Sequence, residues 1–119
     1  MSNVTPLPRS VRAGLGTPSQ TAFNRIELSR IMDLYGRMVS AGHWRDYAID
    51  LTRDVAIFSA FRRSAERPEV RIEKRPALHQ RQGMWALIGE TGAVLRRGHE
   101  LAGVLAPVER RLLRLVDRD

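Results

Sequence analysis

The chain contains no cysteine. This absence excludes disulfides, thiolate nucleophiles, iron–sulfur clusters and cysteine-ligated zinc. No stretch approaches the roughly 20 apolar residues that a membrane span needs. The first 20 residues also lack the apolar run of a secretory signal peptide. We therefore expect a soluble protein of the cytoplasm.

Lysine is almost missing as well, because Lys74 is the only lysine among 20 basic residues. The 13 acidic residues leave a net charge of +7. Such a charge favours acidic partners, namely nucleic acid, an acidic protein or an anionic surface. Arginine suits such partners because its planar fork binds phosphate and carboxylate with two hydrogen bonds. A solvated basic surface, or the codon bias of a GC-rich genome, explains the same composition without a specific function.

The chain length of 119 residues supports one domain. Residues 1–20 are rich in proline, glycine, serine and threonine and have no hydrophobic period. This composition predicts a disordered or loosely docked tail. Residues 21–119 are then the single domain.

The strongest helical signal starts at Asn24. Asparagine is a good helix N-cap, and Glu27 stands three residues later, as in a capping box. Apolar residues then recur at helical spacing from Leu28 to Val39, and Gly42 suits the end of a helix. The pattern predicts a helix over residues 25–41.

Beyond this helix, apolar and polar residues alternate with period two, which is typical of strands. Because the links are short, neighbouring strands are expected to pair in antiparallel fashion. Both faces of the second strand are largely apolar, so we expect it to be central and covered on both sides. The predicted strands are residues 46–51, 55–62, 70–75, 84–88 and 93–95.

The C-terminal segment is helical again, since apolar residues keep helical phase from Leu101 to Leu115. Pro107 interrupts it, because proline lacks an N–H group and restricts the backbone. The segment therefore predicts two short helices or one kinked helix. The whole chain predicts an α+β domain, with an N-terminal helix, an antiparallel meander of about five strands and this C-terminal helix or helix pair.

The catalytic inventory is thin. The three histidines, His43, His79 and His99, lack the spacing of a helical metal site. No nucleophile elbow, phosphate-binding loop or dinucleotide motif is present. We predict no catalytic residue, metal or cofactor, and the balance is against an enzyme. The exception is a site assembled only in the fold, where His79 or His99 would meet a carboxylate.

The basic residues of the meander form the sharpest pattern. They surround the second and third strands and the links beside them, so a continuous positive patch is expected. Three glutamates among them, Glu66, Glu69 and Glu73, can neutralise this patch through cross-strand pairs. Trp85 and His79 can stack on bases, although Trp85 is favoured as a core residue. The candidate partner-binding or nucleic-acid-binding residues are Arg62, Arg63, Arg67, Arg71, Lys74, Arg75, Arg81, Arg96 and Arg97.

Two segments, residues 23–76 and 81–105, resemble a family of small uncharacterised proteins from alphaproteobacteria, known as a domain of unknown function. The runs VRIEKRP at residues 70–76 and RGHEL at residues 97–101 are the most distinctive pieces. The resemblance implies a bacterial cytoplasmic origin. It implies no activity and no functional residue.

Two functions follow as hypotheses. The first is a non-enzymatic interaction module that binds a protein partner, such as an acidic protein, or its own copy to form a homo-oligomer. The second is binding of RNA or DNA through the arginine patch, which predicts affinity that falls steeply with salt.

Overall fold

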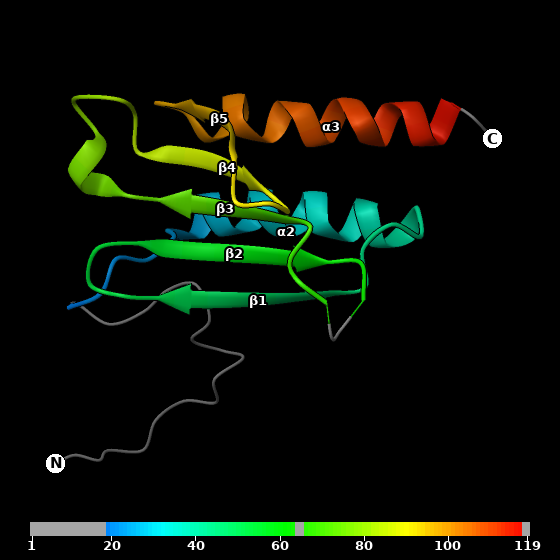
Figure 1. Cartoon of the computed structure of the whole chain (residues 1–119), viewed down its shortest axis with the longest axis horizontal. Coiled ribbons are helices and arrows are strands. Elements are labelled where there is room, and N and C mark those ends of the chain that lie inside the picture. Colours follow the sequence, from blue (N-terminus) through cyan, green and yellow to red (C-terminus); the bar gives the residue numbers. More distant parts are fainter. Residues whose placement is uncertain (1–18, 64–65, 118–119) are drawn as a thin grey trace, which may run out of the picture.

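The computed structural model describes residues 19–63 and 66–117. It contains two α-helices, one short 3-10 helix and five strands within these residues (Figure 1). In chain order the elements are α2 (Arg25–Ser40), β1 (Asp46–Leu51), β2 (Ala56–Phe61), β3 (Val70–Lys74), η1 (Pro76–Leu78), β4 (Trp85–Gly89), β5 (Val94–Gly98) and α3 (Leu101–Asp117).

The strands form one sheet in the order β1-β2-β3-β4-β5, and every neighbouring pair is antiparallel. The predicted meander and the α+β class are thus confirmed. The short links explain this order, because sequential strands pair most readily with their neighbours. β5 is longer than predicted and includes Arg96 and Arg97, because it pairs with β4 as far as Gly98.

Helix α2 begins at the predicted cap. The Asn24 side chain accepts a hydrogen bond from the Glu27 N–H at 2.8 Å, and the Glu27 carboxylate accepts one from the Asn24 N–H at 2.8 Å. Both bonds satisfy N–H groups that have no partner inside the helix. The helix ends with Ala41 as its C-cap, followed by Gly42 at φ +79°.

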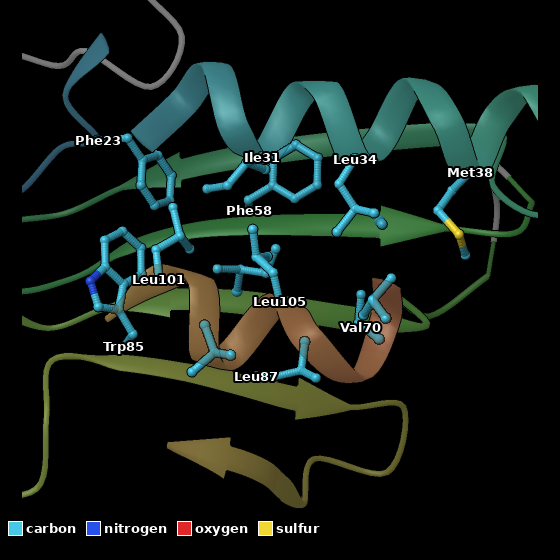
Figure 2. Packing of buried hydrophobic residues seen from close by; sticks show 14 of the residues in the cluster. Phe23, Ile31, Leu34, Met38, Phe58, Val70, Trp85, Leu87, Leu101 and Leu105 are labelled. Carbon is cyan, nitrogen blue, oxygen red and sulfur yellow. The ribbon is translucent and has the colours of Figure 1, made fainter. Parts of the chain in front are cut away.

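Both helices pack on the same face of the sheet. In Figure 1, α2 passes behind the middle strands, while α3 runs along β4 and β5. Figure 2 shows how their apolar stripes meet the strands: Ile31 and Leu34 of α2 lie over Phe58, while Leu101 and Leu105 extend from α3. This core contains most of the large apolar side chains that are buried in the described residues. This burial is the main stabilising contribution to the fold.

Helix α3 is one helix of 17 residues with Pro107 inside it, and not two short helices. Proline cannot donate to the carbonyl four residues earlier, which belongs to Gly103. The structure supplies another donor, because Arg96 Nη1 donates to the Gly103 carbonyl at 3.3 Å. The side chain of β5 thereby replaces one hydrogen bond that the proline removes.

Strand β2 has neighbours on both sides, as predicted. The expectation that its second face is also covered is not met by any helix of the described residues, since α2 and α3 share one face. On that second face Ser59 is buried, but Ile57 and Phe61 are only half-buried, whereas Phe58 on the first face is fully buried. The sheet therefore has one covered face and one face without a helix.

The predicted tail of residues 1–20 falls mostly outside the described residues. At its end, Gln20 Nε2 donates to the Leu51 carbonyl at 3.1 Å, and the Thr21 N–H donates to the Thr52 carbonyl at 2.8 Å. These bonds attach the start of the described chain to the end of β1. Neither α2 nor α3 is long and apolar enough to cross a membrane, and no other described segment forms such a helix.

Candidate functional site

The sheet face that lacks a helix is called the open face. Its members alternate along each strand with residues of the core, and the strand register places them side by side. Its apolar residues range from the buried Ala86 and Ile88 to the exposed Val94, and they lie among arginines and carboxylates. The open face consists of Asp46, Ala48, Asp50, Ile57, Ser59, Phe61, Arg71, Glu73, Ala86, Ile88, Val94 and Arg97.

Two arginines of the open face hold hydrogen-bond donors that no group satisfies. Arg71 Nε and Arg97 Nη1 are both buried, and neither has a hydrogen-bond partner among residues 19–63 and 66–117. Leaving a buried donor unpaired costs about 1–3 kcal/mol, and more when the group is charged. Native proteins keep few such groups, so each needs a reason.

The register shows what lies between these arginines. Ala86 pairs with both Glu73 and Arg97 in one row across the strands. Ile88 pairs with Arg71 in the next row. The two guanidinium groups therefore come from neighbouring rows, separated by apolar side chains.

Glu73 is the acidic residue nearest to the centre of this face, and it is buried. Its Oε1 accepts from Arg75 Nε at 3.3 Å. Among the described residues, it forms no ion pair with Arg71 or Arg97. Glu73 is thus committed to Arg75, and the two unpaired donors remain.

Lys74, one of the predicted binding residues, lies on the covered face. Its Nζ donates to Glu27 at 2.7 Å and to the Ala22 carbonyl at 2.9 Å, and it lies 5.8 Å from the Trp85 ring centre. Its side chain is only 13% exposed. Lys74 therefore connects the sheet to the start of α2 rather than facing a ligand.

The other predicted basic residues divide into separate environments. Arg96 also lies on the helix side, bonded to α3. Arg62 pairs with Glu69 and Glu90, and Arg63 pairs with Glu66. Arg67 and Arg81 are exposed and make no ion pair within the described part of the chain. The predicted set is therefore not one continuous patch, and it leaves Arg71 and Arg97 together on the open face.

A second polar cluster centres on Glu69, just before β3. Its Oε1 accepts from Trp44 Nε1 at 2.6 Å, and its Oε2 accepts from Arg111 Nη2 at 2.8 Å. His43 Nε2 lies 3.2 Å and Arg62 Nε 3.5 Å from the same Oε2. Because the carboxylate is 11% exposed and surrounded by donors, it joins the sheet to α3 and to the end of α2.

The Glu69 cluster was not predicted from the sequence. His43 and Arg111 stand 26 and 42 positions from Glu69, so no local spacing connects them. Burial lowers the pKa of His43, and the positive charge of Arg111 lowers it further, while Glu69 acts in the opposite direction. His43 is therefore neutral at pH 7. Its contacts are typical of a structural connection.

The described residues contain no convergent catalytic set. His79 and His99 are exposed, and no group of three acidic or histidine residues is arranged to hold a metal. A groove of about 410 Å³ between α2 and α3 is bordered by Arg37, Asp33 and Glu109, whose charges pair with each other. Trp85 is buried and stacks on Phe23, with ring centres 6.2 Å apart. It is a core residue, as the sequence favoured.

Comparison with known proteins places the chain in a family. A family model described as "Protein of unknown function (DUF2794)" matches residues 21–105. The chain belongs to the DUF2794 family. The predicted resemblance to a domain-of-unknown-function family is thus confirmed. The DUF2794 match covers α2, all five strands and the start of α3, and hence the whole open face, but it ends before Arg111. No curated protein and no solved structure matches the chain.

Proposed function

We propose that this DUF2794 chain is a non-enzymatic interaction module that binds another protein with the open face of its sheet, in the cytoplasm. The observation that carries the proposal is the pair of buried, unpaired guanidinium nitrogens of Arg71 and Arg97 on that face. A ligand that accepts hydrogen bonds from these two nitrogens gains the free energy that is lost while they are unpaired.

The surroundings of these arginines support a polypeptide as the occupant. Ile57 and Phe61 are half-buried, and Val94 is 52% exposed. Binding interfaces combine such apolar positions with a few charged groups, and arginine is enriched among the residues that contribute most affinity. A segment with both apolar and acidic side chains matches this combination.

The same surroundings disfavour nucleic acid at this face. Base stacking needs exposed aromatic rings, and the open face offers only the half-buried Phe61. Asp46 and Asp50 at its edge also repel a polyanion. A single well-placed carboxylate avoids this repulsion, whereas a continuous row of phosphates does not.

The experiment places a photo-cross-linking amino acid at position 57 of the full chain in cells. The matched control carries it at position 26, since Ile26 is an apolar residue of α2 with 72% exposure. The captured protein is identified, purified and titrated against the variants Ile57→Glu and Ile26→Glu. We expect at least about a tenfold loss of affinity for Ile57→Glu only, because a buried, unpaired charge at an interface is costly.

Two results contradict the proposal. Equal capture at both positions, or equal affinity of both variants, shows that the open face is not the binding surface. If the cross-linked product is a dimer of this chain, the partner is a second copy of the chain and not another protein. Light scattering on the purified chain verifies that outcome.

RNA or DNA binding is the alternative function. It is supported by the net charge of +7 and by the unpaired, exposed Arg67 and Arg81. Titration of labelled RNA and DNA at low and moderate salt tests it. This alternative expects a steep loss of affinity with salt and loss of binding in the double variant Arg71→Glu/Arg75→Glu. Absence of binding at low salt excludes it.

A further inference from the structure

We infer that the partner presents a carboxylate, from an aspartate, a glutamate or its own C-terminus, that binds the guanidinium groups of Arg71 and Arg97 on the open face. This inference rests on the proposed interaction surface and names the chemical group that the surface receives. The juxtaposition that carries it is two buried, unpaired guanidinium nitrogens in neighbouring rows of one sheet face.

No carboxylate of the described residues reaches these donors. Glu73 is the natural candidate, because it lies in the same row as Arg97. Two strand spacings separate their backbones by roughly 10 Å, and Ala86 between them has no polar group. Glu73 accepts instead from Arg75 Nε. The donors therefore need an acceptor that comes from outside the described residues.

The acceptor that fits these donors best is a carboxylate. A guanidinium group binds a carboxylate through two parallel N–H···O bonds, which adds strength and fixed geometry. Both arginine residues are partly exposed although these two nitrogens are not, so each guanidinium group has to turn toward solvent to meet the carboxylate. Neutral acceptors form weaker bonds and leave the buried positive charge uncompensated.

The side chains beside the arginines favour a carboxylate that belongs to an apolar segment. Ile88 lies next to Arg71 in register, with Val94 beyond it on β5. Ile88 is buried, whereas Val94 is 52% exposed and is the side chain that offers apolar surface to a ligand. A carboxylate on an apolar segment therefore satisfies both parts of the surface, which a free anion such as acetate does not.

The test uses two peptides with blocked ends, Val-Ile-Glu-Val-Ile and its match Val-Ile-Gln-Val-Ile, added to the full chain. The Nε–Hε signals of Arg71 and Arg97 are followed by ¹⁵N NMR. We expect the glutamate peptide to shift both signals and to bind about tenfold or more tightly than the glutamine peptide. Arg97→Lys keeps the charge but loses the fork, and it should weaken binding. Arg30→Met, an exposed position on α2, should leave binding unchanged.

The outcomes separate this inference from the proposed function. If both peptides bind equally, or if neither binds while position 57 still captures its partner, the carboxylate is wrong and the interaction surface stands. If position 57 captures nothing and neither peptide binds, both are wrong. If a hexanucleotide of RNA shifts the same two signals at lower concentration than the glutamate peptide, phosphate replaces carboxylate and the inference is overturned.

Discussion

The two faces of the sheet treat their basic residues in opposite ways. On the covered face, Lys74 binds Glu27 and a carbonyl, and Arg96 binds the carbonyl that Pro107 leaves free. On the open face, Arg71 and Arg97 each keep a buried nitrogen without a partner. Both faces belong to the same five strands. The basic residues of the covered face thus connect elements of the fold, whereas those of the open face keep the unsatisfied donors on which the proposed partner binding rests.

The largest contrast between the faces should appear in apolar truncations. Phe58→Ala removes a fully buried ring from the covered face, and we expect a loss of about 3–5 kcal/mol in the free energy of unfolding. Phe61→Ala, three residues away on the open face, should cost less than half as much, because that ring is half-buried. Urea denaturation measures both. Equal losses would show that the two faces are packed alike.

Charge removal sharpens the same comparison on one strand. Lys74→Met leaves Glu27 partly buried without its cation, and we expect a loss of about 2–3 kcal/mol in the free energy of unfolding. Arg71→Met removes an unpaired buried donor, so stability should stay within about 0.5 kcal/mol or increase. Thermal and urea unfolding of both variants provide the measurement. Comparable destabilisation by both changes would argue that Arg71 has a structural partner.

A double-mutant cycle tests whether Arg96 compensates for the hydrogen bond that Pro107 removes from α3. Arg96→Ala should cost about 0.5–1 kcal/mol, because the Gly103 carbonyl then loses its donor. In the Pro107→Ala background, residue 107 can donate to that carbonyl, so the same change should cost almost nothing. The coupling is obtained from four urea titrations. Additive effects would mean that Arg96 does not compensate for the proline.

The smallest expected effect is a pH dependence from the Glu69 cluster. The pKa of His43 is lowered in the folded chain, so the unfolded chain binds more protons as the pH falls below the usual value of 6.5. The contribution of His43 to stability is therefore complete above pH 6.5 and is lost as the pH falls toward its lower folded pKa. His43→Gln should flatten this part of the stability profile. An unchanged profile would show that His43 does not cause it.

The local features of the fold were predictable because their signals are short. Asn24 and Glu27 form a capping box within four residues, and the alternation of Val70, Ile72 and Lys74 defines one face of β3. That alternation also carried the signal that Lys74 shares the core side, although the predicted binding set included it. Lys74 lies an even number of positions from the buried Val70 and Ile72 and therefore shares their face, whereas Arg71 lies an odd number of positions away and is on the other face.

The remaining features depend on contacts between distant residues. The bond from Arg96 to the Gly103 carbonyl exists only because α3 lies along β5, and no sequence pattern gives that placement. The Glu69 cluster likewise assembles three elements. Which sheet face the two helices cover is also a tertiary outcome. The candidate site follows from that choice, so the sequence indicated arginines but not the pair on the open face.

The most direct test of the account is the affinity of the purified partner captured at position 57 for the double variant Arg71→Met/Arg97→Met, compared with the unaltered chain. The account predicts a loss of at least about tenfold with no loss of folding stability, since one buried nitrogen of each arginine lacks a partner in the described part of the chain. Unchanged affinity in a folded double variant would contradict it.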